Sequence, residues 1–272
     1  MIDLAIIGSG PAALTAAIYA ARAGVKTEVF EKAKIGGALT EIDRIENYPG
    51  FVGAGADLAE NLKKQAEEAG AKISYGACEK IEANDTGVEL VIDGEPTAAR
   101  AVLVATGSEP KTLELDTTSP ISYCAICDAP LYKGKNIAVI GGGNSAVQEA
   151  LYLSEIVNHI VLYSHSGLKA DVVLVDKIKA AGNIEIHENA MPTKAELDAL
   201  DGVFVFIGKR PATTFLPEGL LDDKGYIVTR DYVAAPGIFA AGDVRSGSTK
   251  QAITAAADGA AAALKAVEYL KN

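Results

Sequence analysis

Leu4-Ala5-Ile6-Ile7-Gly8-Ser9-Gly10-Pro11-Ala12-Ala13 places a short apolar run directly before a glycine-rich turn. The apolar run predicts a buried β-strand, and the Ala-rich sequence that follows predicts a helix continuing to about Ala23. In this pattern Gly8 permits a tight turn, Gly10 lets a pyrophosphate approach the backbone, and Ala13 permits close helix packing. The stretch therefore predicts a βα unit that binds phosphate at the helix N-terminus.

A second strand with an acidic end follows this unit. The residues Thr27 to Phe30 are apolar or β-branched apart from Glu28, and Glu31 follows them directly, roughly twenty residues beyond the glycines. An acid at this place binds the ribose of a dinucleotide. A glycine-rich turn alone is weak support, but strand, helix and Glu31 together favour a dinucleotide site.

The pattern recurs in the middle of the chain. Asn136 to Ile140 predicts a strand, Gly141-Gly142-Gly143-Asn144-Ser145-Ala146 a turn, and Ser145 to about Leu153 a helix. After the next predicted strand, His159 to Tyr163, the sequence Ser164-His165-Ser166 stands where NAD sites have an acid and NADP sites an Arg. We therefore expect a second nucleotide-type unit that has kept its fold and lost its dinucleotide.

Two cysteines lie between the glycine-rich turns, in Cys124-Ala125-Ile126-Cys127-Asp128. Thiols at this spacing can form a disulfide within one turn, and a nearby helix N-terminus lowers a thiol pKa, which favours thiol–disulfide exchange near neutral pH. A metal site would need further Cys or His ligands, and the nearest His, His159, is far along the chain. A purely structural disulfide is the other alternative.

The last part of the chain predicts another strand and helix. Gly237 to Ala241 is an apolar run ending in Gly242-Asp243-Val244, and an Ala-dense helix is predicted from Gln251 to Val267. Backbone N–H groups of Lys250, Gln251 and Ala252 at the helix start could face a ligand with negative charge. Simple packing would produce the same periodicity.

Composition narrows the class of protein. The chain has 272 residues, 49% of them hydrophobic, and a formal net charge of −11, which argues against nucleic-acid binding because phosphates would be repelled. No apolar run reaches the length of a membrane span and no signal peptide is recognisable, so we expect a cytoplasmic protein without a membrane or metal role. The third Cys, Cys78, has no nearby Cys and is interpreted as a buried structural thiol.

Taken together, these motifs resemble those of the low-molecular-weight thioredoxin reductases. The resemblance covers nearly the whole chain, and further matching segments are Gly36-Gly37, Glu46-Asn47-Tyr48-Pro49-Gly50-Phe51, Ala105-Thr106-Gly107 and Ser122-Tyr123 before the Cys pair. It implies an α/β fold of two Rossmann-like three-layer domains. The FAD-binding domain, residues 1–113 and 234–272, would be interrupted by a truncated NAD(P)H-binding-like domain, residues 114–233, that carries the Cys pair.

The resemblance also implies roles for particular residues. Cys127 would face the flavin, Cys124 would attack the disulfide of a thioredoxin-like partner, and Asp128 would exchange a proton. A helix cap is the alternative for Asp128. The residues expected to bind FAD are Gly8, Gly10, Pro11, Ala12, Glu31, Gly37, Asn47, Ala105, Thr106, Gly107, Gly242, Asp243, Lys250, Gln251 and Ala252.

Two departures from the family pattern concern the electron donor. The Arg cluster that binds the phosphate of NADPH is replaced by Ser164-His165-Ser166, and Asn189 to Leu200 is a short connection where relatives have a β-meander. We therefore expect a thioredoxin-disulfide reductase and homodimer that uses a donor other than NADPH, such as ferredoxin. The alternatives are an NAD(P)H-dependent thioredoxin reductase, a flavoprotein electron transferase of the ferredoxin–NADP reductase type, and a noncatalytic flavin protein.

Overall fold

The computed structural model describes residues 1–42, 44–84 and 87–271, with only the backbone described at position 127. The chain forms two compact units. The first unit consists of Met1–Glu109 and Pro211–Asn272, and the second unit, Pro110–Arg210, is inserted between these stretches. Two short strands, β9 (Ser108–Pro110) and β15 (Lys209–Pro211), carry the chain between the units and pair with each other.

The first unit is built on a largely parallel sheet in the order β16-β17-β8-β1-β2-β5, to which a β6–β7 hairpin is joined through β8. Its strands are β1 (Ile2–Ile7), β2 (Thr27–Glu31), β5 (Lys72–Tyr75), β6 (Cys78–Asn84), β7 (Gly87–Ile92), β8 (Glu95–Val104), β16 (Val233–Ala235) and β17 (Ile238–Ala240). A separate hairpin is formed by β3 (Ile45–Tyr48) and β4 (Phe51–Gly53). Short 3-10 helices are η1 (Gly37–Glu41), η3 (Glu218–Leu220) and η4 (Gly242–Val244).

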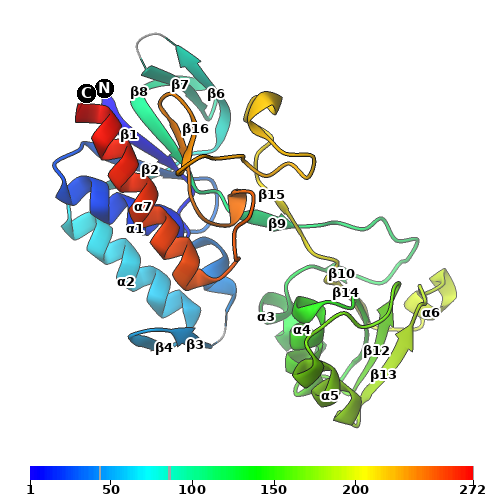
Figure 1. Cartoon of the computed structure of the whole chain (residues 1–272). Coiled ribbons are helices and arrows are strands. Elements are labelled where there is room, and N and C mark those ends of the chain that lie inside the picture. The colour runs from blue at the N-terminus through cyan, green and yellow to red at the C-terminus, as the bar shows by residue number, and fades with distance from the viewer. Residues whose placement is uncertain (43, 85–86, 272) are drawn as a thin grey trace. The chain divides into compact units, whose positions relative to one another are not determined.

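Helices cover one face of this sheet (Figure 1). They are α1 (Pro11–Arg22), α2 (Gly55–Glu68) and α7 (Ala252–Lys271). Successive strand residues point to opposite faces, so Leu4 and Ile6 pack in the core beneath these helices, while Ala5 and Ile7 pack in a second core on the other face. With both faces buried, β1 has no polar residue after Asp3, as expected for a central parallel strand.

The second unit has a five-stranded parallel sheet in the order β10-β14-β11-β12-β13. The strands are β10 (Ile121–Ser122), β11 (Asn136–Ile140), β12 (His159–Ser164), β13 (Ile184–Glu188) and β14 (Gly202–Val205). The helices are α3 (Ala125–Asp128), η2 (Ala129–Tyr132), α4 (Asn144–Ser154), α5 (Val172–Ala180) and α6 (Lys194–Asp198). Cores lie on both faces of the sheet, one under α3–α5 and a smaller one that includes Leu197 of α6.

The predicted fold class is confirmed, since both units are α/β and each glycine-rich turn joins a strand to a helix. The domain limits differ from those expected. The inserted domain was expected over residues 114–233, whereas the second unit is Pro110–Arg210. Phe215, Leu216 and Ile227 pack in the core of the first unit, together with Ile81 of β6. Across the described residues, no helix is both long and apolar enough to cross a membrane.

Candidate functional site

The first glycine-rich turn has the shape of a phosphate cradle. Gly8 has a φ of +98°, and a Cβ atom there would lie 2.6 Å from the carbonyl oxygen of Ala105, so only glycine is compatible with this position. Gly10 is different, because a Cβ atom added to it would meet nothing within 4 Å. The turn therefore leaves open space in front of Gly10, at the N-terminus of α1, where Pro11 occupies the first turn of the helix.

Glu31 lies at the end of β2 and is held from two sides. The hydroxyl of Ser9 donates to its Oε2 at 2.6 Å, and the backbone N–H of Ala33 donates to its Oε1 at 2.9 Å. Ser9 in turn accepts a hydrogen bond from the N–H of Gly36 at 3.1 Å. The carboxylate is thus fixed beside the turn with lone pairs remaining for ribose hydroxyls. The hydrogen bond from Ser9 to Glu31 was not predicted, although the place of Ser9 between two glycines was an available signal.

Gly37 and the predicted flavin-side amides also lie in the first unit. A Cβ atom added to Gly37, whose φ is +53°, would approach the Cα of Gly10 to 3.4 Å, so η1 begins against the turn. Asn47 of β3 donates from Nδ2 to Oε1 of Gln251 at 3.1 Å, although the two residues are far apart in sequence. The structure therefore brings Gly37 against Gly10, and Asn47 against Gln251.

Ala105, Thr106 and Gly107 follow β8 and connect to the returning chain. Thr106 donates from its hydroxyl to the carbonyl oxygen of Ala212 at 2.7 Å, and the N–H of Ala212 donates to the carbonyl oxygen of Gly107 at 3.2 Å. Gly107 has a φ of +67°. This exchange of hydrogen bonds ties the segment after β8 to the segment after β15.

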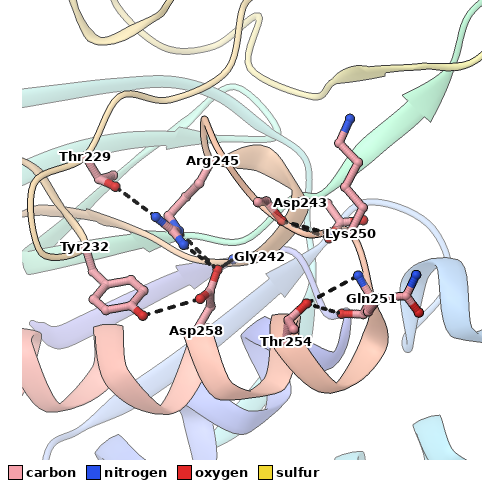
Figure 2. A network of polar contacts seen from close by, with 10 residues as sticks. Thr229, Tyr232, Gly242, Asp243, Arg245, Lys250, Gln251, Thr254 and Asp258 are labelled. Atoms are coloured by element: carbon pink, nitrogen blue, oxygen red, sulfur yellow. Dashed lines mark hydrogen bonds and ion pairs between the residues drawn. The ribbon is translucent and has the colours of Figure 1, made fainter. Parts of the chain in front are cut away.

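A partly buried ion pair supports the Gly242-Asp243 turn, as Figure 2 shows. The Asp258 carboxylate in α7 accepts from the N–H of Gly242 at 3.2 Å and from the Arg245 guanidinium at 2.7 Å. Arg245 also lies over the ring of Tyr232, with 4.7 Å between the guanidinium carbon and the ring centroid. Arg245 and Asp258 were not found from the sequence, because their relation depends on how α7 packs under the turn.

The start of α7 is ordered by the chain's own hydroxyls. Ser248 donates to Asp243 at 3.4 Å and accepts from the N–H of Lys250 at 3.3 Å, while Thr254 accepts from the N–H of Gln251 at 3.3 Å. Lys250 has a φ of +58°, and its ammonium donates to the hydroxyl of Tyr226 at 2.6 Å. Ala252 is the first residue of the helix. Two of the three N–H groups expected to face a ligand therefore already have partners.

The predicted catalytic residues lie in the second unit. The sulfur of Cys124 is in a disulfide, and its backbone N–H donates to the hydroxyl of Ser122 at 3.1 Å. That hydroxyl donates to Oδ2 of Asp128 at 2.7 Å. The side chain of Cys127 lies outside the described part of the structure, so its pairing with Cys124 stays a prediction. Asp128 occupies the N-cap position of η2 but makes no side-chain hydrogen bond to that helix, so the helix-cap alternative stays open.

The second glycine-rich turn differs from the first at the ribose position. Ser164, which ends β12 as Glu31 ends β2, is buried, and its hydroxyl donates to the carbonyl oxygen of Gly167 at 2.6 Å. A Cβ atom at Gly142 would lie 2.1 Å from the Ser164 oxygen. The loop after β12 therefore packs directly on the turn.

The first unit fits an adenine dinucleotide with a flavin. The open space at Gly10, the fixed acid Glu31 and the approach of Gly37 provide the cradle, and Asn47 and Gln251 provide adjacent amide groups. Gly242 lies beside α1, since a Cβ atom there would be 2.9 Å from the Cβ of Ala12.

Comparisons with known proteins agree with this geometry. The family described as "Pyridine nucleotide-disulphide oxidoreductase" matches residues 2–259. A thioredoxin reductase of Treponema pallidum is 37% identical, over 98% of this chain and 97% of that protein. The crystal structure of Lactococcus lactis thioredoxin reductase is 30% identical with a TM-score of 0.92, covering 100% of this chain and 99% of that one.

The name of a third relative includes ferredoxin. The crystal structure of a ferredoxin-flavin thioredoxin reductase from Clostridium acetobutylicum is 31% identical with a TM-score of 0.58, and the match covers 99% of this chain and 98% of that one. The chain therefore belongs to the low-molecular-weight thioredoxin reductase family of pyridine nucleotide-disulphide oxidoreductases and is an FAD-type flavoprotein oxidoreductase.

Proposed function

We propose that this protein is a thioredoxin-disulfide reductase whose electrons come from a donor other than NADPH, with ferredoxin as the preferred candidate. The observation that carries the reductase assignment is the disulfide-bonded Cys124 beside an acid, Asp128, to which it is connected through Ser122. Related proteins named thioredoxin reductase cover almost the full chain, which supports the same reaction here.

The proposed reaction is thiol–disulfide exchange. FAD, held by the first unit, supplies two electrons at a time when bound. Uptake of two electrons and two protons breaks the Cys124 disulfide and leaves two thiols. The Cys124 thiol gives its proton to the Asp128 carboxylate, and the resulting thiolate attacks the partner disulfide, which forms a mixed disulfide and releases one partner thiolate that takes up a proton. Cys127 attacks the mixed disulfide next, which releases the reduced partner and closes the pair again. Asp128 is proposed as the group that exchanges the protons.

The first support for a donor other than NADPH is the buried Ser164. NADP sites place an Arg near this position to bind the ribose phosphate, and NAD sites place an acid there. Ser164 can replace neither an Arg nor an acid here, because its hydroxyl already donates to the carbonyl oxygen of Gly167 within the loop. His165 and Ser166 follow it and are exposed, but neither provides the bidentate, permanently charged group that binds phosphate best.

The second support is an acid at the N-terminus of α4. Asp171 accepts at Oδ2 from the side-chain amide of Asn144 at 2.9 Å, and its N–H donates back to Asn144 Oδ1 at 2.8 Å. Asn144 is the first residue of α4, where a pyrophosphate would bind. A carboxylate at this position disfavours a second anion by like-charge repulsion.

One observation favours the alternative, an NAD(P)H-dependent thioredoxin reductase. Gly143, which corresponds to Gly10 of the first turn, also has nothing within 4 Å of an added Cβ atom. The turn could still accept a phosphate despite Asp171. The electron transferase alternative has no comparable support, because the Cys pair would be unused in it.

The decisive experiment is anaerobic stopped-flow absorbance of the FAD-loaded protein. The protein is mixed separately with NADPH, NADH and reduced ferredoxin, and flavin bleaching is followed before oxidised thioredoxin is added. We expect bleaching with ferredoxin and transfer to thioredoxin. Rapid bleaching with NADPH would overturn the donor assignment. The variant Cys124→Ser should still bleach but fail to reduce thioredoxin, whereas unchanged thioredoxin reduction would overturn the reductase assignment.

A further inference from the structure

The hydroxyl of Ser122 lies between the Asp128 carboxylate and the backbone of Cys124. Ser122 ends β10 and is 4% exposed. Its oxygen lies 2.7 Å from Asp128 Oδ2, 3.1 Å from the backbone nitrogen of Cys124 and 3.2 Å from the carbonyl oxygen of Cys124. One buried hydroxyl thus contacts both the proposed proton-exchange group and the peptide of the proposed attacking residue.

A hydroxyl has one hydrogen to donate and two lone pairs to accept with. One lone pair accepts from the Cys124 N–H in either state of Asp128. When the Asp128 carboxylate is ionised, the hydroxyl donates its hydrogen to Oδ2. When Oδ2 carries a proton, that proton can be donated to the second lone pair, and the hydroxyl can rotate to donate to the Cys124 carbonyl oxygen. Every donor therefore has a partner in both states.

We propose that Ser122 is a positioning residue that holds Asp128 beside Cys124 in both of its protonation states. This inference rests on the proposed role of Asp128 in proton exchange. When Asp128 gives its proton to a sulfur, that proton is the only one transferred. The hydroxyl keeps its own hydrogen, which rotates from the Cys124 carbonyl oxygen to the newly formed carboxylate. The Asp128 carboxylate can then take up the next proton without a rearrangement of the surrounding chain.

The test uses Ser122→Ala, alone and combined with Asp128→Asn, in FAD-loaded protein. The protein is reduced anaerobically with one equivalent of dithionite and mixed with oxidised thioredoxin, or in parallel with the small disulfide DTNB. Ser122→Ala should slow the exchange about tenfold, part of the contribution expected of a general acid. In the Asp128→Asn background the same change should alter the rate less than about twofold, because residues that act together are non-additive.

Matched variants separate positioning from folding. Ser122→Thr keeps the hydroxyl, and its exchange rate should stay within about threefold of that of the unchanged protein. Valine has the shape of threonine without the hydroxyl, so Ser122→Val should slow the exchange as much as Ser122→Ala does. Ser154→Ala is the control, because that hydroxyl donates to Leu151 O at 2.7 Å within α4. The Thr and Val pair carries the test if Ser122→Ala does not fold.

Three results would overturn the inference: equal effects of Ser122→Ala with and without Asp128, no effect of Ser122→Ala, or equal rates for the Thr and Val variants. Failure of the proposed function is a separate result. In that case the unchanged protein reduces DTNB but not thioredoxin, and the comparison of variants with DTNB still tests the role of Ser122.

Discussion

Gly259 of α7 lies directly against the carbonyl oxygen of Ala12 in α1, where an added Cβ atom would stand only 2.0 Å away. The main-chain surfaces of these two helices are in contact there, and α1 begins at the predicted phosphate turn. Gly259 is buried within α7, on the helix-covered side of the sheet. The absence of a side chain at Gly259 therefore determines how closely α7 approaches the cradle.

Gly259→Ala should destabilise the protein by about 2 kcal/mol, because a backbone carbonyl cannot yield as a flexible side chain can. The free energy of unfolding is measured by urea titration, with the FAD content of the purified protein as a second readout. Gly219→Ala is the matched control, since nothing lies within 4 Å of its added Cβ atom. Equal stability of the two variants would contradict the close contact.

Asp258→Asn should destabilise the first unit by about 2 kcal/mol, because it removes the charge that balances Arg245 and weakens the acceptor for Gly242 N–H. The side chains of the pair are only 18% and 15% exposed, so water compensates little. The control is Asp231→Asn, which breaks an exposed pair with Lys265 and should destabilise the protein much less. Both are compared by urea titration, and an equal loss would show that burial of the first pair is unimportant.

Glu31→Gln should weaken FAD binding roughly tenfold, because an amide replaces a carboxylate that accepts from Ser9 and Ala33 and is expected to accept from ribose. Fluorescence titration of the FAD-free protein measures the dissociation constant. Glu28→Gln, on the same strand but bonded to Lys72 and Ser74, is the control and should bind FAD normally. An unchanged FAD dissociation constant for Glu31→Gln would show that Glu31 does not contribute to FAD binding.

The sequence predicted the two βα turns well because each depends on local rules: a buried strand, glycines at fixed spacing and a helix. The strand Asn136–Ile140 was predicted with its observed limits, and α1 ends one residue before the predicted Ala23. The expected limits of the inserted domain placed residues 211–233 outside the first unit, because nothing local in that segment shows that Leu216 and Ile227 pack with Ile81. Ser122 was missed as a functional residue because its contacts arise from the fold of the β10–α3 segment.

Cys78 should react slowly with thiol reagents in the folded protein. Burial, the largest cause, raises the pKa of this thiol from 9.0 to about 11, and a backbone hydrogen bond with Lys80 opposes the shift only in part. At pH 8 the reactive thiolate should thus be roughly a hundred times scarcer than in the unfolded chain. Alkylation by iodoacetamide without reductant, compared in native and urea-unfolded protein, measures this ratio.

The pH dependence of Cys78 has a definite sign. Because the folded state raises its pKa, the neutral thiol contributes stability that is complete below about pH 9 and is lost as the pH rises through about 11. The alkylation rate of the native protein should therefore keep increasing from pH 8 to pH 11. Cys78→Ala provides the background labelling to subtract. A rate that levels off near pH 9 would mean that the thiol is not held in an apolar environment.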